Sequence, residues 1–249
     1  MKRGLKWLLL GLASYLVILI ATLPIRPVYS LFAASLAPLN LQGVQGKLWN
    51  GRATRVYYNK LSIGSISWTY RPTDLLSGHI GFDFINQDHL TRTSGTAGIS
   101  LLGQPYLENV DGYAPASNLY KMLGSYPLSL SGKMQYTLNQ LRLNNNQIGL
   151  IQGSMTWRNA AIQAPFQARL GTLELQLSSE QGNILIQISN KGGQLGLEGS
   201  IIIQADKRIQ TDLRITPRKN ANPGLINVLR SFGKSDRSGH ITIKFNGYI

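Results

Sequence analysis

Apolar and polar residues alternate with period two in segment after segment of this chain, from about residue 44 onward. Ile80, Phe82 and Phe84 alternate with more polar neighbours, and the same pattern recurs further along the chain. The recurrences are centred on Met134–Leu138, Leu173–Leu177, Ile184–Ile188, Ile209–Ile215 and Ile241–Phe245. Successive side chains of a β-strand point to opposite faces, so each segment is predicted to be a strand with one apolar and one polar face.

The connections between these strands are short. Gln181-Gly182 and Lys191-Gly192-Gly193 separate consecutive strands by very few residues. Such connectors join antiparallel neighbours, so the chain from about 128 to 216 is predicted to be a meander. The fold class that follows is mainly β: a large antiparallel sheet, curved or folded over, with two or three short helices. A sandwich, a barrel and an open half-pipe would each cover the apolar face in a different way.

Helix signals are few in the body of the chain. One helix is expected over 115–123. Another should follow Asn222 as N-cap, with Pro223 in its first turn and Gly233 past its end. A third short helix is expected from Ser30 to Leu36.

The amino terminus carries an uncharged run from Trp7 to Ile25. As a helix this run would extend about 28 Å, close to the thickness of a bilayer core. Lys2, Arg3 and Lys6 precede it, which predicts a cytoplasmic amino terminus and an exported body. A cleaved secretory signal is the alternative, although its apolar core usually covers only about 7 to 15 residues.

This topology divides the chain into four parts. Residues 1–6 form a cytoplasmic amino terminus and 7–25 a transmembrane helix. Residues 26–42 form a juxtamembrane linker with a short helix, and 43–249 a periplasmic β-rich domain. The expected location is the inner membrane, crossed once, with the carboxyl-terminal domain in the periplasm.

Composition argues against an enzyme. The 249 residues include no cysteine, which excludes disulfides, thiol nucleophiles and cysteine-ligated metal sites. The three histidines, His79, His89 and His240, lack metal-ligand spacing, and the common hydrolase and zinc motifs are missing. No catalytic, cofactor-binding or metal-binding residue is predicted.

The chain is strongly basic, with 25 Lys and Arg against 11 Asp and Glu, a formal net charge of +14. Export of the body makes nucleic acid an unsuitable partner and favours anionic phospholipid or an acidic protein. Arg218, Lys219, Arg230 and Lys234 are interaction candidates, as are Trp49 and Arg52. The first four belong to a larger cluster with Arg214 and Arg237, whose alternative role is that of a solvated face.

The stretch GVQGKLWNGRA, residues 43–53, resembles a phosphate-binding loop only superficially, because Leu41 and Leu48 stand where that motif needs a glycine and a hydroxyl. Asn50-Gly51 is a strong signal for a two-residue hairpin turn, with strands over about 44–49 and 52–57. This register places Trp49 opposite Arg52. The two residues would form either a stabilising cation–π pair or an exposed recognition surface.

Several stretches occur together in an order that resembles the type II secretion system protein N family. They are GVQGKLWNGRA (43–53), SWTYRPTDLLSG (67–78), YPLSLSGKMQYTLNQLRL (126–143), QGSMTWRNAAI (152–162), LGTLELQL (170–177), SNKGGQLGLEGS (189–200) and LRITPRKNANPGLINVLRSFG (213–233). The resemblance implies a non-enzymatic accessory subunit in the inner membrane. Its periplasmic domain would contact the platform proteins C, L and M during export of folded proteins across the outer membrane.

A shorter stretch is similar to AsmA-like envelope proteins, which are associated with phospholipid handling. Trp68, Pro72, Leu75, Leu76 and Gly78 carry this second resemblance. It implies an alternative function, a lipid-binding or lipid-transfer module of the cell envelope. Lipid bound in stoichiometric amounts would favour this alternative over the secretion role.

Overall fold

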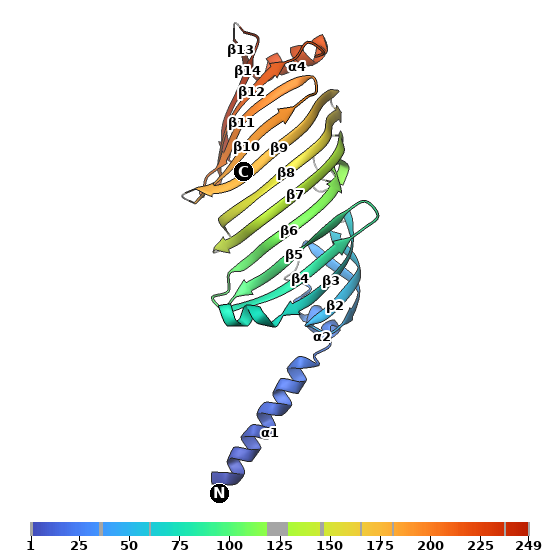
Figure 1. Ribbon diagram of the computed structural model, residues 1–249, viewed down its shortest axis with the longest axis vertical. Helices are drawn as coiled ribbons and strands as arrows, with labels where there is room; N and C mark the ends of the chain where they lie inside the picture. The colour runs from blue at the N-terminus through green and yellow to red at the C-terminus, as the bar shows by residue number, and fades with distance from the viewer. Residues whose placement is uncertain are drawn as a thin grey trace.

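One antiparallel sheet of fourteen strands makes up most of the molecule in the computed structural model (Figure 1). The structure describes residues 2–34, 37–59, 61–118, 129–144, 147–164, 166–180, 182–236 and 238–248. The strands are β1 (Leu39–Gly46), β2 (Asn50–Tyr58), β3 (Leu61–Arg71), β4 (His79–Gln87), β5 (Arg92–Ser100), β6 (Pro105–Pro115), β7 (Ser129–Asn144), β8 (Gln147–Ala164), β9 (Ala168–Glu180), β10 (Asn183–Lys191), β11 (Leu195–Ile203), β12 (Arg208–Pro217), β13 (Lys234–Ser235) and β14 (Ile241–Tyr248). The helices are α1 (Lys2–Ala21), α2 (Ile25–Phe32), the 3₁₀ helix η1 (Pro72–Ser77) and α4 (Pro223–Phe232).

The expected meander is confirmed and extends beyond the predicted segment. From β1 to β12 every strand pairs with the next strand in the sequence, and only the last two strands exchange places. Each segment with period-two alternation lies in a strand of its own. In the described chain, β1 and β13 are the two edge strands, so the sheet stays open: it is curved rather than folded over.

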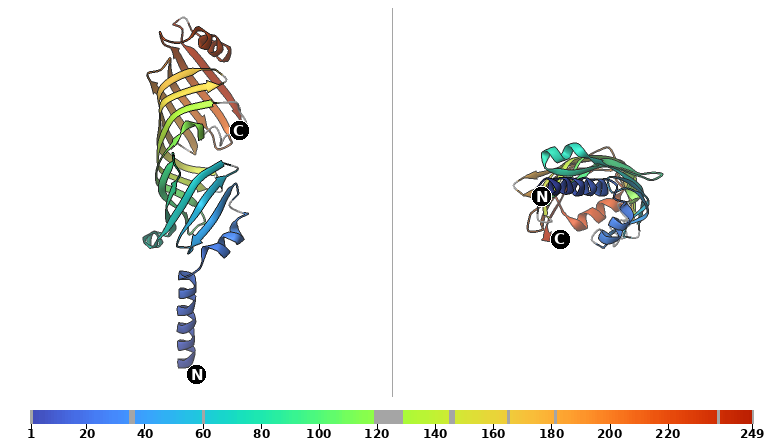
Figure 2. Two further views of the ribbon diagram at one scale, coloured as in Figure 1. Left: turned by 90° about the vertical axis from the view of Figure 1, so that its right-hand side faces the viewer. Right: turned by 90° about the horizontal axis from the view of Figure 1, so that it is seen from below.

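The sheet curls around its long axis, and α2 and α4 both lie within the curve, near its two ends (Figure 2). We call the face that these helices contact the inner face and the opposite face the outer face. Side chains of alternating parity divide between the two faces. The apolar residues of the alternating segments point to the inner face, as the contacts of Ile215 and Ile241 with α4 show.

The larger core lies at the carboxyl-terminal end, beneath α4. Leu225 and Leu229 of this helix are buried in one cluster with Ile215, Ile241 and Trp157. The predicted helix start is confirmed, since the Asn222 side chain accepts a hydrogen bond of 2.8 Å from the amide of Gly224, with Pro223 in the first turn.

A smaller core lies at the amino-terminal end, beneath α2. Ile25 is buried together with Val44, Ala53 and Val56. The Tyr29 hydroxyl also accepts a hydrogen bond of 2.8 Å from the amide of Leu41, which ties α2 to the edge strand β1.

The helix expected over Ser30–Leu36 is α2 and begins earlier, at Ile25. Pro27 is tolerated because the first turn of a helix has unpaired amides. The helix expected over 115–123 lies partly outside the described residues, and 116–118 are helical. The 3₁₀ helix η1 was not predicted.

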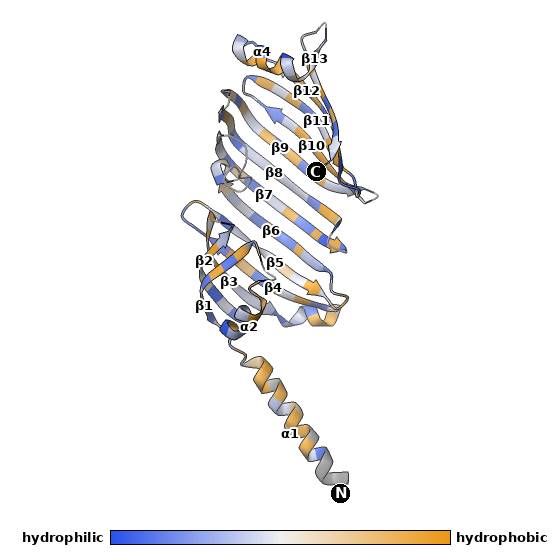
Figure 3. Ribbon diagram, turned by 180° about the vertical axis from the view of Figure 1, so that it is seen from behind, coloured by the Kyte–Doolittle hydropathy of each residue, from blue (hydrophilic) through white to orange (hydrophobic). Residues whose placement is uncertain are grey.

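The amino-terminal helix α1 differs in extent from the expected span of Trp7 to Ile25. It ends at Ala21, because Pro24 is extended and restricts the residue before it. Judged over the described part of the chain, no helix combines the length and the apolar character needed to cross a membrane. The helix α1 extends away from the sheet (Figure 3), and apolar side chains on it such as those of Trp7, Leu12 and Ile18 are exposed.

The hairpin of residues 43–53 exists, but its predicted register is wrong. Val44 pairs with Ala53 and Gln45 with Arg52, so the turn falls over Lys47–Trp49 and not at Asn50-Gly51. The residue with positive φ next to this turn is Gly46, at φ +96°. The turn moves because Leu48 and Trp49 bond to the amino-terminal segment: the Leu48 amide donates to the Leu23 carbonyl at 3.0 Å.

Candidate functional site

A hollow on the inner face adjoins the core beneath α2 and extends over strands β1 to β6. Its two adjoining parts have volumes of about 350 and 490 Å³ and share Ile66, Trp68 and Phe84. We call it the trough. Its other lining residues are Leu39, Leu41, Val56, Ile63, Ile80, Phe82, Asn86, Thr93, Ala97, Gly98, Ile99 and Leu107.

The polar side chains of the trough are bonded to the protein. The Trp68 indole nitrogen donates to the Leu48 carbonyl at 2.9 Å, and the Asn86 amide donates to the Ser65 carbonyl at 3.0 Å. Thr93 shares a hydrogen bond of 2.6 Å with the Tyr136 hydroxyl. The trough therefore offers almost only apolar surface, which suits acyl chains or the apolar side chains of a partner.

Trp49 lies where the sheet meets α1. Its indole nitrogen donates to the Ile20 carbonyl at 2.7 Å, and its ring packs against Tyr70 and Phe82 at centroid distances of 4.8 and 6.4 Å. The expected pair with Arg52 is wrong, because Arg52 instead donates to Gln45 at 3.1 Å. Trp49 thus joins the amino-terminal helix to the aromatic side of the sheet.

The basic candidates do not share one face. Arg218 donates to the Gly192 carbonyl, whereas Lys219 and Arg230 are exposed on the loop before α4 and on α4 itself. Arg214 lies opposite Glu198 in the register of β12 and β11. Its side chain is on the outer face, away from α4. Arg237 and the side chain of Lys234, together with those of Lys2 and Arg3, lie outside the described residues, while Lys6 is exposed.

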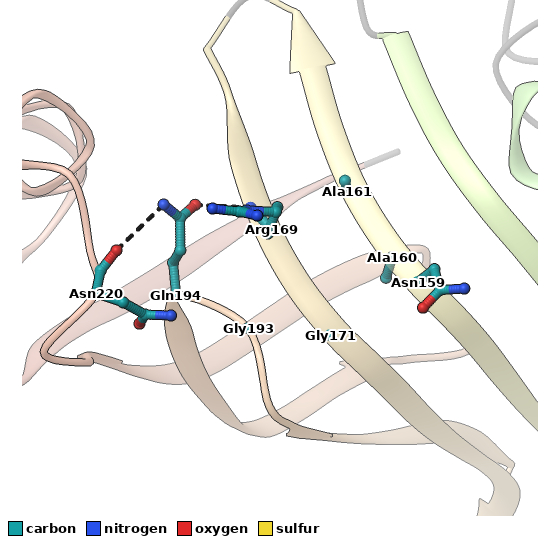
Figure 4. Close-up of a pocket in the computed structure, with 8 residues that line it drawn as sticks. All are labelled: Asn159, Ala160, Ala161, Arg169, Gly171, Gly193, Gln194 and Asn220. Carbon is teal, nitrogen blue, oxygen red and sulfur yellow. Dashed lines mark hydrogen bonds between the residues drawn. The ribbon is translucent and has the colours of Figure 1, made fainter.

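A second, polar hollow of about 380 Å³ is lined by Gly193 and Gln194 among others (Figure 4), and Arg218 bonds to the carbonyl of Gly192, next to this lining. Gln194 spans it: its side-chain oxygen accepts from the Arg169 amide at 2.9 Å and its nitrogen donates to the Asn220 carbonyl at 3.3 Å. The lining contains no carboxylate, and Arg169 is its one ionisable group. The hydrogen bonds of Gln194 join β9, the β10–β11 connection and the loop before α4. The polar groups of this hollow therefore hold these three segments together.

A polar network stabilises the outer face behind the trough. Arg71 lies 3.3 Å from Asp74 and 3.4 Å from Asp83, and Thr96 donates to Asp83 at 2.9 Å. The Tyr106 hydroxyl donates to Asp74 at 3.3 Å. Burial raises the pKa of Tyr106, and the negative charge of Asp74 raises this pKa further.

Sequence reasoning missed this network, although two glycines in neighbouring strands signal it. A Cβ atom on Gly81 would lie 2.7 Å from the Tyr106 hydroxyl, and one on Gly98 would lie 2.6 Å from its ring. Glycine inside a strand often marks such a close approach. Tyr106 therefore packs flat across β4 and β5, and its hydroxyl reaches η1.

Among the described residues, no group of three or more His, Cys, Asp or Glu side chains is placed to hold a metal ion. The carboxylates of the outer-face network are bonded to Arg71, Thr96 and Tyr106. The trough itself has no ionisable side chain in its lining, and the hydroxyl of Thr93 is bonded to Tyr136. Its arrangement supports apolar binding.

Comparisons with known proteins give one consistent result. The family model described as type II secretion system (T2SS), protein N matches residues 37–244. Three relatives are each called type II secretion system protein N. The Vibrio cholerae protein is 24% identical over 85% of both chains, and the Aeromonas hydrophila protein 21% over the whole of both. The Klebsiella pneumoniae protein is 26% identical over 99% of this chain and 97% of its own.

No solved structure gives a significant match. The family model nevertheless covers the whole sheet from β1 into β14, including the trough and the outer-face network. The match thus confirms the resemblance carried by the ordered stretches from residue 43 to 233. The chain belongs to the type II secretion system protein N family.

Proposed function

We propose that this type II secretion component is a non-enzymatic accessory subunit of the inner membrane whose sheet binds another subunit of the secretion machine. The trough is the observation that carries the proposal. Its lining is apolar and its polar groups are already bonded to the protein, so it suits an apolar surface of a partner. Platform proteins of the C, L and M types are the partners that we infer from the family.

We infer that α1 and the residues up to Ile25 anchor the chain in the inner membrane, crossing it once. The support is the exposure of apolar side chains such as Trp7, Leu12 and Ile18, which would be costly to leave in water. The cations that precede them support a cytoplasmic location for residues 1–6 and a periplasmic location for the domain from residue 43.

The chain offers a matched pair of residues for testing the trough. Ile99 lies in the trough and is 41% exposed, while Ile85 lies on the outer face and is 42% exposed. The test compares cells that lack the gene with cells that express the wild type, Ile99→Glu or Ile85→Glu. Exoproteins are measured in the medium and in the periplasm, and outer-membrane permeability is measured in parallel.

We expect loss of the gene to retain folded exoproteins in the periplasm without increased permeability. Ile99→Glu should reproduce this defect and Ile85→Glu should not, because only the trough face is altered. Normal secretion by the Ile99→Glu cells, at wild-type protein levels, would rule out the trough as the partner site.

Lipid binding is the second candidate, because the same apolar lining suits acyl chains, and anionic phospholipid fits the basic charge of the chain. The full chain would be purified with a photoreactive phospholipid and the crosslinked peptides mapped. Crosslinks in β3–β6 that Ile99→Glu abolishes would favour a lipid module. Crosslinks confined to α1 would favour the protein-binding role.

A further inference from the structure

Four leucines at one end of the sheet are exposed. Leu75 and Leu76 in η1 are 50% and 93% exposed, and Leu101 and Leu102 in the β5–β6 turn are 70% and 86% exposed. We call these four residues the leucine foot. The two segments adjoin, since the Leu101 amide donates to the Gly78 carbonyl at 2.9 Å.

The foot is held in place by polar contacts that point into the protein. Asp74, next to Leu75, bonds to Arg71 at 3.3 Å and accepts from Tyr106 at 3.3 Å. The Ser77 hydroxyl donates to the Asp74 carbonyl at 2.9 Å. The segments 75–78 and 100–104 contain no charged residue, so the foot presents leucines without a charge that would have to lose its hydration.

The foot lies at the same end of the sheet as α1 (Figures 1 and 2). A short series of contacts links the two. The Trp49 indole bonds to the Ile20 carbonyl, and the Tyr70 amide donates to the Trp49 carbonyl at 2.7 Å, two residues before η1 begins at Pro72. The end of α1 is therefore linked through Trp49 and Tyr70 to the segment that leads into η1.

We propose that the leucine foot inserts into the surface of the bilayer that holds α1. This inference rests on the proposed membrane anchoring. Once α1 is anchored, the foot is held close to the lipid. Its insertion is then an intramolecular step, and the anchor has already lost most of the translational entropy that binding requires. Two contact points, α1 and the foot, would then fix the tilt of the sheet relative to the membrane.

The test uses the absence of cysteine from the wild-type chain, which makes any introduced cysteine a unique labelling site. Leu76→Cys, Leu102→Cys, Leu12→Cys and Leu90→Cys are each made in the full chain, labelled with an environment-sensitive fluorophore and reconstituted into phospholipid nanodiscs. Leu90 is the matched control: it is 70% exposed, like Leu101, but lies in the turn at the opposite end of β4 and β5. Lipids carrying a quencher near the headgroup are then introduced.

We expect quenching and blue-shifted emission at positions 76 and 102, as at position 12 in α1, and neither effect at position 90. Quenching at 12 without quenching at 76 and 102 would contradict insertion of the leucine foot but would support the membrane anchor. The four leucines would then be candidates for contact with a protein partner. A lack of quenching at 12 would overturn the anchor and, with it, the foot. Equal quenching at 90 and 76 would also overturn the foot, since contact with lipid would then not be specific.

Discussion

The inner face of the sheet is apolar along its length, but it is covered by helices in some places and open in another. At the ends, α4 and α2 cover the inner face with buried side chains such as Leu229 and Ile25. Next to α2, over β1 to β6, the trough stays open, and the polar network around Tyr106 lies behind it on the outer face. The covered parts of the inner face contribute to stability, whereas the open trough is the part that we propose for binding.

The largest effect is expected at the carboxyl-terminal end. Leu229→Ala removes a side chain that is 6% exposed from the larger core. We expect a loss of about 2–5 kcal/mol in the free energy of unfolding, typical of cavity-forming substitutions. Chemical denaturation of the full chain in detergent measures it, with the exposed Leu90→Ala as control. Equal effects for the two variants would break the comparison between covered and open regions.

A smaller effect is expected at the amino-terminal end. Tyr29→Phe leaves the Leu41 amide without its hydrogen bond of 2.8 Å. An amide left unpaired in a partly buried place costs about 1–3 kcal/mol. Hydrogen exchange of β1 should therefore accelerate while β14 keeps its protection. Faster exchange at both ends would show that α2 supports the whole sheet and not only its own end.

The outer-face network should give a pH-dependent effect. Because the pKa of Tyr106 is raised in the folded protein, its contribution is complete below the ordinary tyrosine value of about 10 and is lost as pH rises through the higher folded value. Tyr106→Phe is expected to cost about 0.5–1.5 kcal/mol at neutral pH. Its deficit relative to the wild type should shrink at alkaline pH.

Unfolding curves at neutral and alkaline pH provide the measurement, with the exposed Tyr113→Phe as control. If the loss in unfolding free energy is the same at both pH values, it comes from the packing of Tyr106 and not from its bond to Asp74. The region around β4 to β6 would then be stabilised by packing rather than by this polar contact.

The smallest effect on stability is expected in the trough. Ile99→Glu and Ile85→Glu both change half-exposed side chains, so each should alter the unfolding free energy by no more than about 0.5 kcal/mol. The melting temperatures of the two purified variants test this. A large loss for Ile99→Glu alone would mean that the trough is part of the core, and the secretion comparison would then need Ile99→Ser in its place.

Much of the fold could be predicted because the strands follow a local rule. Period-two alternation located strands such as β4 and β10, and Asn222 with Pro223 correctly located the start of α4. The hairpin at Asn50-Gly51 was misplaced because Leu48 and Trp49 bond to a segment some 25 residues earlier, a contact that no local pattern reports. Gly51 allows close approach of Trp68 instead of forming the turn.

The candidate site was less accessible to sequence reasoning. Alternation predicts an apolar face but does not show which part of it a helix will cover, so the trough could not be located. The basic residues near the carboxyl terminus are close in sequence, yet neighbouring positions in a strand face opposite sides. Arg214 and Ile215 show this directly, since only Ile215 contributes to the core beneath α4.

The strand order has a consequence for how the molecule is made. Nearly every strand pairs with the one before it, so the contacts that build the sheet span short stretches of chain. A chain delivered from its amino terminus can therefore add each new strand to an edge that is already in place, without waiting for distant segments. The exception is the end of the sheet, where β14 pairs with β12 and the earlier strand β13 pairs only with β14, so growth finishes only when the last residues arrive.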